Sequence, residues 1–505
     1  MSLVIKQNSK TLYKKYVQHL QKIADVKYAA AVLQWDQETY MPPKGANYRA
    51  QQVATLSEIA HHLYTQTSFK KILLQLKEAT DLNDEQQKNI TLSWYDYTQQ
   101  EKLTPLFVRK LSTTVSKSFQ AWMEARGKNK FSLFQKDLAA LVKLKQQEAD
   151  LLGYEQHAYN ALINQYEKDC TVTELDRVFD NLQIPLKKIL AQIAAQPQVD
   201  DSLLQQPYAA NTQWQWGLDI MKQMGFDFEA GRQDKSEHPF TTNFSSQDIR
   251  LTTRIDENDF SNMTWSCIHE LGHGLYEQGL PAAAYGLPLG EYASLSIHES
   301  QSRLWENNIG RSHNVWKYLL PIAQKYFPQQ LGNTNTTAFY KAINKVAPSL
   351  IRTEADELTY HFHVIIRYQL EKALMGGQLP VKEIPAYWNQ LYQQYLGITV
   401  PNDKQGCLQD VHWSHGSFGY FPTYSLGSLY AAQFFAAAKK QVPGLEEGIT
   451  KGQFQPLLAW LRNNVHIHGR RYNSQQLCEQ ISGEPLNIDY FMNYAHDKYK
   501  SIYEF

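Results

Sequence analysis

Two histidines and a glutamate lie within five consecutive residues, in the run His-Glu-Leu-Gly-His from His269 to His273. On an α-helix, side chains four residues apart lie on one face, one turn apart, so both imidazoles can bind a single metal ion. Glu270 lies beside the first histidine, where a carboxylate can take a proton from metal-bound water. The pattern favours a zinc site, and a buried histidine pair satisfied by hydrogen bonds is the structural alternative.

A catalytic zinc site needs a third protein ligand and one open position for water. Glu299 lies far enough beyond His273 to be on a second helix placed beside the first. His298 is its rival, but adjacent helical side chains diverge by about 100°, so only one of the two can face the metal. Glu277, one turn beyond His273, is a weaker candidate that suits an outer hydrogen-bond partner better. For Glu299 itself, a solvated helix carboxylate is the alternative interpretation.

The helix that carries the two histidines has recognisable ends. Asp259 or Ser261 can cap its start, and Gly279 can end it. Inside it, Gly272 and Gly274 each cost about 1 kcal/mol relative to alanine. We therefore expect a facing backbone or a substrate to approach this helix closely at the two glycines.

Around this helix, the sequence predicts a mainly α protein with a small β-sheet near the active site. Apolar residues recur at three- and four-residue spacing in the segments 10–33, 46–64, 84–102, 104–125, 132–151 and 172–195. The segment 196–207 indicates a loop, and the best period-two strand pattern lies at 239–254. A helical pattern resumes near Asp259 and continues to the C-terminus, with an interruption around 400–425.

These patterns favour a single domain over residues 1–505. Its N-terminal helical part covers about 1–235, and its zinc-bearing catalytic part covers about 236–505. No internal repeat or low-complexity tract divides the chain, which supports one large unit.

Composition and charge argue against several kinds of partner. The 505 residues include 50 Lys and Arg and 50 Asp and Glu, so the formal net charge is zero. Such a chain lacks the positive field that holds nucleic acid or an anionic membrane. The sequence shows no signal-peptide pattern and no run of about 18 apolar residues, so we expect no membrane span. The four cysteines lie far apart, without metal-type pairing, which favours a reducing, cytoplasmic location. Neither Cys267 nor Cys407 is assigned to the metal, because two histidines and a glutamate already fill the protein positions.

Several further segments are similar to motifs of one known family. In chain order, the similar segments are Leu33–Ala46, Asp248–Thr252, His269–His273, His298–Gln301, Ile351–Asp356 and Gly406–Trp413. Through them the chain resembles the carboxypeptidase Taq family of zinc metallocarboxypeptidases nearly end to end. The resemblance implies that Glu299 is the third metal ligand, beside His269 and His273.

The resemblance also implies a fold and an activity. The fold is mostly helical with a deep central groove, usually as a homodimer. The implied activity is stepwise removal of C-terminal residues from peptides with broad specificity, commonly sparing proline. The cofactor is Zn²⁺, with Co²⁺ as a substitute because affinity alone selects weakly among these metals. Zinc-bound water would attack the scissile carbonyl with Glu270 as the general base.

A carboxypeptidase must also recognise the free C-terminal carboxylate of its peptide. Guanidinium suits this task because it is planar, permanently charged and bidentate. Arg352 is the favoured clamp and Arg250 its rival. Alternatively, either arginine pairs with a motif aspartate, Asp356 or Asp248, and serves only as scaffold.

A segment rich in glycine and aromatic residues supplies further hydrogen-bond donors. Tyr420 or Tyr424 can stabilise the oxyanion, as phenols do in related zinc peptidases, and His412 can contact the substrate backbone. An aromatic cluster in the groove wall is the alternative. The pair His361 and His363 would share a face on a strand and diverge on a helix, and both are candidates for outer contacts only.

Two other functions stay open at this point. One is a zinc oligoendopeptidase that uses the same metal set in a similar helical groove. The other is a non-catalytic, helical peptide-binding scaffold with a structural or vestigial zinc ion. Against the scaffold, Glu270 is present where a base belongs, and no spare Cys or His lies at a spacing that would close the site.

Overall fold

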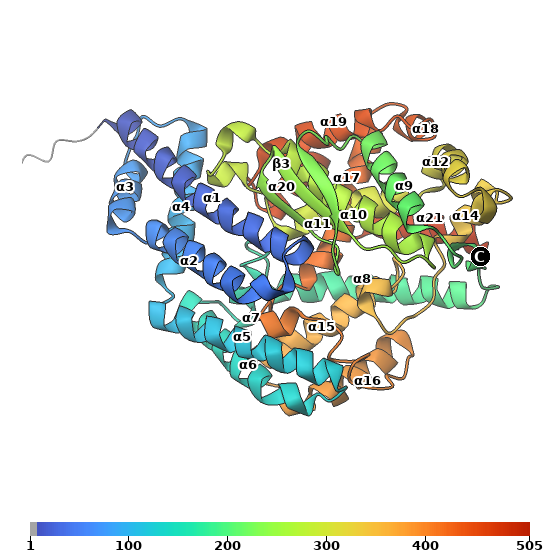
Figure 1. The fold of residues 1–505 in the computed structure, drawn as a ribbon, viewed down its shortest axis with the longest axis horizontal. Coiled ribbons are helices and arrows are strands. Elements are labelled where there is room, and N and C mark those ends of the chain that lie inside the picture. The colour runs from blue at the N-terminus through green and yellow to red at the C-terminus, as the bar shows by residue number, and fades with distance from the viewer. Residues whose placement is uncertain (1–7) are drawn as a thin grey trace, which may run out of the picture.

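The N-terminal helices form a hydrophobic cluster of their own. The structure is a computed structural model that describes residues 8–505. Its first helices are α1 (Ser9–Thr39), α2 (Ala46–Tyr64), α3 (Thr67–Lys77) and α4 (Asp84–Glu101). The side chain of Asn8 caps α1, and Asn83 with Gln86 forms a capping box at α4. Buried side chains such as Tyr16, Phe69 and Leu73 pack these helices together, and they lie at one side of the molecule (Figure 1).

The next helices extend the chain towards the catalytic part. They are α5 (Pro105–Gly127), α6 (Ser132–Leu152), α7 (Tyr159–Ile163), α8 (Val172–Ala194) and α9 (Ala210–Gln223). A capping box of Thr171 and Glu174 begins α8. Helices α6 and α7 pack against α15 (Tyr360–Met375), which lies about 200 residues further along the chain (Figure 1). The predicted helices in this half are confirmed, and the loop at 196–207 contains only a short 3₁₀ turn, Ser202–Leu204.

A three-stranded sheet follows, in the order β1-β3-β2. Its strands are β1 (Gly231–Lys235), β2 (Thr241–Ser245) and β3 (Asp248–Thr253), with β1 parallel and β2 antiparallel to β3. The segment 239–254, which has the best strand pattern, contains two of these strands, β2 and β3, joined by a tight turn. Ile249 and Leu251 of β3 are fully buried in the main core, on the side of helix α10 (Phe260–Gly279).

Helix α10 has the predicted ends. The Asp259 carboxylate accepts a hydrogen bond from the backbone N–H of Ser261 at 2.7 Å, and Gly279 is the last helical residue. After it come α11 (Leu295–Arg303) and a seven-residue π-helix, Leu304–Gly310. The later helices are α12 (His313–Tyr326), α13 (Pro328–Leu331), α14 (Thr336–Ala342), α15, α16 (Ile384–Leu396), α17 (Pro422–Gln441), α18 (Leu445–Ile449), α19 (Gln455–Asn464), α20 (Ser474–Ser482) and α21 (Asp489–Tyr503).

Two glycines let three of these helices approach one another closely. A Cβ atom on Gly272 of α10 would lie 2.5 Å from the backbone of Gln301 and Ser302 in α11. A Cβ on Gly427 of α17 would lie 2.5 Å from Cγ of Glu299. The expected close approach at Gly272 is confirmed, and α11 lies between α10 and α17 with its carboxylate beside the histidine helix.

The larger core cluster joins the sheet to the catalytic helices, with buried side chains from Ala125 to Tyr503. The boundary between the two clusters therefore falls well before residue 235, and the single domain over 1–505 stays a prediction. Within residues 8–505, no helix combines the length and apolar character that crossing a membrane requires.

Candidate active site

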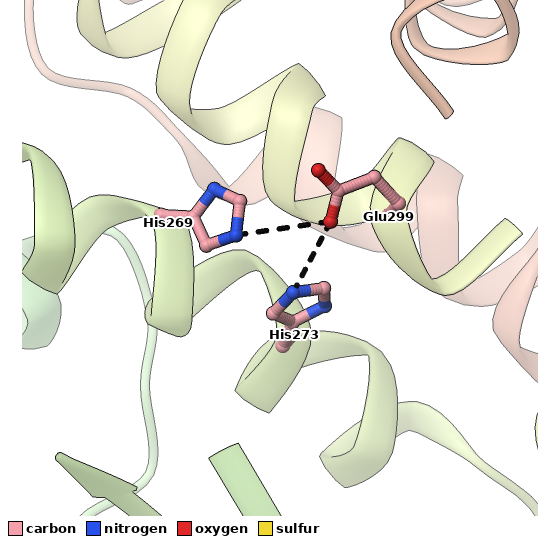
Figure 2. Close-up of side chains that lie close together, drawn as sticks. All are labelled: His269, His273 and Glu299. Atoms are coloured by element: carbon pink, nitrogen blue, oxygen red, sulfur yellow. Dashed lines mark ion pairs between the residues drawn. The ribbon is translucent and has the colours of Figure 1, made fainter. Parts of the chain in front are cut away.

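The side chains of His269, His273 and Glu299 converge on one point (Figure 2). Oε2 of Glu299 lies 3.7 Å from Nε2 of His269 and 3.5 Å from Nε2 of His273. One ligand atom from each residue lies within 4.8 Å of the other two. The four-residue spacing on α10 and the close contact with α11 therefore bring together the three residues that the sequence singled out.

The outer nitrogen of each imidazole is held by an acceptor. Nδ1 of His269 lies 2.8 Å from a carboxylate oxygen of Glu306, and Nδ1 of His273 lies 3.0 Å from the carbonyl oxygen of His298. A carboxylate and a carbonyl oxygen only accept hydrogen bonds, so each Nδ1 carries the proton. In the neutral ring that binds a metal, each Nε2 therefore directs its lone pair towards Glu299.

Three electron-rich atoms that face one another repel unless a cation lies between them. The charges around these atoms favour a positive charge between them. Burial alone would lower the pKa of His269, but the carboxylates of Glu299 and Glu306 outweigh burial and raise it. Burial and the neighbouring imidazoles instead lower the pKa of His273, which keeps this ring neutral. Two neutral imidazole nitrogens and a carboxylate are ligands that zinc prefers. The residues present therefore fit a divalent metal ion.

Arg303 orders the carboxylates around the site. Its Nε lies 2.7 Å from Oε1 of Glu299, and its Nη1 lies 3.1 Å from Oε2 of Glu306. Burial opposes ionisation of Glu306, but the charges of Arg303 and His269 hold its pKa well below the usual range. The oxygen that orients His269 is therefore charged. Sequence reasoning missed Glu306 because it lies on the π-helix, where helical spacing does not predict which face it occupies.

Replacing Glu306 with alanine is expected to weaken metal binding by about 10- to 100-fold, the range for outer partners of metal-binding histidines. The variant leaves Nδ1 of His269 without its acceptor. Metal affinity is measured by competition with a chelator of known strength. Glu357→Ala is the matched control, because this buried carboxylate bonds Tyr494, Lys498 and Tyr499 instead. Equal metal affinities in the two variants would remove Glu306 from this role.

His298 does not join the converging set. Its Nε2 lies 2.8 Å from Glu277, and its Nδ1 lies 2.6 Å from Nδ1 of His273. The ring thus lies on the outer side of His273, away from Nε2. Glu277 also accepts a hydrogen bond from Asn243, so its contacts are those of an outer partner.

Glu270 is buried, with 7% of its surface exposed, and is not part of the converging set. The hydroxyl of Thr241 on β2 donates a 2.6 Å hydrogen bond to its Oε2. Burial raises the pKa of Glu270, and His269 and Thr241 oppose that shift. The small sheet thereby positions the carboxylate next to the first histidine.

Arg352 is buried and pairs with Asp410, not with the motif residue Asp356. Its Nε and Nη2 lie 3.1 and 2.9 Å from Oδ1 of Asp410, and its Nη1 donates to the hydroxyl of Tyr360 at 3.2 Å. Asp356 instead accepts the backbone N–H of Thr359 at the start of α15. The Tyr360 ring also lies 4.4 Å below the guanidinium of Arg303, which connects Arg352 to the carboxylate cluster.

Arg250 lies apart from these residues, on the sheet. It makes two bonds to Asp248, at 2.5 and 3.0 Å, and its guanidinium lies 4.9 Å from the ring centre of Trp35 in α1. The pairing of Arg250 with Asp248 is the one that the scaffold alternative describes.

His412, Tyr420 and Tyr424 form one cluster. Nε2 of His412 lies 3.0 Å from the Tyr424 hydroxyl, and the two tyrosine rings lie 5.1 Å apart. The guanidinium of Arg352 lies 4.8 Å from the Tyr424 ring. Burial, with a contribution from the charge of Glu299, raises the pKa of Tyr420 to about 12, so its hydroxyl is protonated and can donate at neutral pH.

The remaining candidates for outer contacts lie elsewhere. On α15 the two histidines diverge: Nδ1 of His361 lies 3.0 Å from the hydroxyl of Ser425, and Nδ1 of His363 lies 3.0 Å from that of Tyr392. The sulfur of Cys267 contacts Gln233. None of these contacts involves the converging side chains.

A cavity of about 1440 Å³ opens between the N-terminal helices and the catalytic part. Its walls include Tyr28, Asp96, Tyr166, Glu277 and Tyr292. Glu277 is hydrogen-bonded to His298, which contacts His273, so the cavity ends close to the converging side chains. Tyr166 also packs against Tyr420, at 5.3 Å between ring centres.

A mainly helical fold with two helical histidines, a carboxylate from the next helix and a glutamate beside them defines the metallopeptidase class. A family model for the carboxypeptidase Taq (M32) metallopeptidases matches residues 15–499. The chain is 37% identical over 497 residues to carboxypeptidase 1 of Bacillus subtilis, covering 98% of this chain and 99% of that protein. The chain therefore belongs to the carboxypeptidase Taq (M32) metallopeptidase family, as its sequence motifs indicated, and is a hydrolase.

Solved structures agree with this assignment. The M32 carboxypeptidase from Deinococcus radiodurans R1 has a TM-score of 0.96 at 36% identity, covering 98% of this chain and all of that chain (100%). Trypanosoma cruzi metallocarboxypeptidase 1 has a TM-score of 0.92 at 32% identity, with coverage of 98% and 100%. The predicted fold class, mainly α with a small sheet, is confirmed.

Proposed function

We propose that this chain is a zinc-dependent carboxypeptidase that releases amino acids stepwise, with broad specificity, from peptides with a free C-terminus. The observation that carries the proposal is the convergence of His269, His273 and Glu299 beside the buried Glu270. The three converging residues would hold Zn²⁺, and Co²⁺ is a possible substitute. A homodimer and a cytoplasmic location remain predictions from the family resemblance and the cysteine usage.

The positions of the metal-binding residues, Glu270 and Thr241 indicate the role of each in the reaction. A bound divalent cation would polarise the scissile carbonyl and lower the pKa of a water molecule beside it. Glu270 accepts the proton of the attacking water and later passes it to the leaving amine. Thr241 holds Oε2 of Glu270 in a fixed place, and the other carboxylate oxygen is available for this proton.

The tyrosine cluster supplies donors for the charge that develops on the substrate. Tyr420 or Tyr424 would donate a hydroxyl hydrogen bond to the oxyanion, and His412 would contact the substrate backbone. The high pKa of Tyr420 supports the donor role, because the hydroxyl keeps its proton at neutral pH. The hydrogen bond to His412 orients the hydroxyl of Tyr424.

Arg352 would clamp the C-terminal carboxylate. A guanidinium has five N–H donors, and Asp410 and Tyr360 engage three of those of Arg352. The two that remain suit the two oxygens of a carboxylate. Arg250 is the weaker candidate, because it lies on the sheet beside Asp248 and Trp35, away from the tyrosine cluster.

The proposal is tested with two peptides that differ only in amidation of the C-terminus. We expect mass spectra of the free acid to show a ladder shortened from the C-terminus, abolished by a chelator and restored by zinc. The amide should lose most of this cleavage, because it lacks the carboxylate that Arg352 would bind. Equal cleavage of both peptides would favour a zinc oligoendopeptidase. An absence of turnover in the zinc-loaded protein would favour the peptide-binding scaffold, and activity that survives the chelator would refute zinc dependence.

A further inference from the structure

Glu371 is a carboxylate on α15 that the proposed chemistry does not use, and none of its surface is exposed. It accepts hydrogen bonds from the hydroxyl of Tyr159, from Nε1 of Trp413 and from the backbone N–H of Gly419, the last two at 2.8 Å each. The indole and the backbone N–H bond different oxygens of the carboxylate.

Two of these bonds fix both ends of a short segment. Trp413 directly follows His412, and Gly419 directly precedes Tyr420. Gly419 has a φ of +96°, and a Cβ atom there would lie 2.7 Å from the backbone of Leu162 in α7. This end of the segment therefore passes too close to α7 for any residue other than glycine.

The same face of α15 holds the chain on the other side of His412. Arg367 lies one helical turn before Glu371, and its Nε lies 2.5 Å from Oδ2 of Asp410. Residues four apart on a helix lie on one face, so Arg367 and Glu371 together hold Asp410, Trp413 and Gly419. His412 therefore lies between Asp410 and Trp413, and Tyr420 directly follows Gly419.

The chemistry of the donors explains why a carboxylate is used. An indole N–H and a backbone N–H can only donate, so they need two acceptor atoms. Glutamate offers two acceptor oxygens, whereas glutamine offers one oxygen and would turn its NH₂ group towards the other donor. Burying the charge is unfavourable: it raises the pKa of Glu371 to about 7, although its three donors and Lys145 oppose the shift.

We infer that Glu371 is a positioning residue for the reaction: through Trp413 and Gly419 it holds the segment that presents His412 and Tyr420 to the substrate. This inference rests on the proposed function, because only in that function do His412 and the tyrosine cluster contact the substrate. Glu371 touches neither the substrate nor the metal-binding side chains, and it acts through the backbone that it fixes.

Glu371→Gln tests the inference. We expect kcat to fall by about tenfold or more, because the displaced Tyr420 would stabilise only the transition state, and KM to rise by a smaller factor, because His412 would contact the bound substrate. Metal content should stay at the wild-type level, since the converging side chains lie on α10 and α11. Hydrogen exchange, followed by mass spectrometry, should become faster in the peptide 412–424. Tyr159→Phe is the matched control: it removes the third donor to the same carboxylate but leaves both bonds to the segment, so kcat and exchange in 412–424 should change far less than in Glu371→Gln.

A double-mutant cycle separates positioning from a general loss of stability. In a Tyr420→Phe background, Glu371→Gln should cost much less in kcat than in the wild type, because the group that it positions is gone. An equal cost in both backgrounds, or unchanged exchange in 412–424, would overturn the inference. Failure of the proposed function looks different: the wild-type protein itself would then lack chelator-sensitive trimming of the free-acid peptide.

Discussion

Replacing Glu270 with glutamine is expected to lower kcat by at least about a hundredfold, the low end for loss of a general base. Glutamine has nearly the shape of glutamate, and its amide oxygen can still accept the hydrogen bond from Thr241. It cannot take up a proton at neutral pH, so the attacking water would have no base beside it. The rate is measured on a free-acid peptide at saturating concentration, so that a change in substrate affinity does not affect the measured kcat.

Metal content must be measured on the same preparation by atomic absorption. We expect it to equal that of the wild type, because Glu270 is not among the converging residues His269, His273 and Glu299. Thr241→Val is a graded control: it keeps the carboxylate but removes the hydroxyl that holds it, so kcat should fall by a smaller factor. Near-normal turnover of a fully metal-loaded Glu270→Gln enzyme would exclude Glu270 as the base.

Local patterns predicted most of the helices. The segment 46–64 coincides with α2, and the segment 132–151 differs from α6 by one residue. For α6 the period of apolar residues carries this information, because the helix buries one face from Phe134 to Ala149. Helix α2 buries only Ala60 and Tyr64, so its pattern is matched by much less burial. The predicted segment 10–33 is too short, since α1 continues to Thr39 through Trp35, which packs against the sheet arginines.

Elements held by distant contacts were harder to predict. Strand β1 has the sequence Gly-Arg-Gln-Asp-Lys, without an apolar residue, and exists because it pairs in parallel with β3. Its pattern could not indicate a strand, because β-structure depends on the partner strand. Helix α3, which buries Phe69 and Leu73, also went unpredicted, although its apolar residues at three- and four-residue spacing offered a signal.

The candidate site likewise combines features that local spacing predicts with features that depend on distant contacts. The spacing of His269 and His273 is local, so the sequence could predict that they share a face. The partners of Arg352 and Arg367 could not be predicted in this way. Both guanidiniums bind Asp410, whereas the sequence offered Asp356 or Asp248 as the partner of the motif arginines. Glycine gave one further signal, because the cost of Gly272 inside a helix indicated a close neighbour, which is α11.

Replacing Arg352 with alanine is expected to remove most of the preference for a free C-terminus. If two N–H groups of Arg352 bind the substrate carboxylate, their loss should lower kcat/KM for the free acid by about thirtyfold or more, the low end for breaking a buried charge pair. The amidated peptide should lose far less, because it has no charge to pair. The measured quantity is the ratio of kcat/KM for the two peptides, which cancels any loss of folded or metal-loaded enzyme.

Two further variants decide what a fall in that ratio means. Arg352→Lys keeps a positive charge but loses the planar fork, so a clamp should recover only part of the preference. Arg250→Ala breaks the pair with Asp248 and should leave the ratio unchanged. If Arg352→Ala lowers kcat/KM for both peptides by the same factor, Arg352 serves as scaffold for Asp410, which Arg367 also holds. If the ratio instead falls in Arg250→Ala, the carboxylate is bound from the sheet, and substrate enters the site with its C-terminus towards α1.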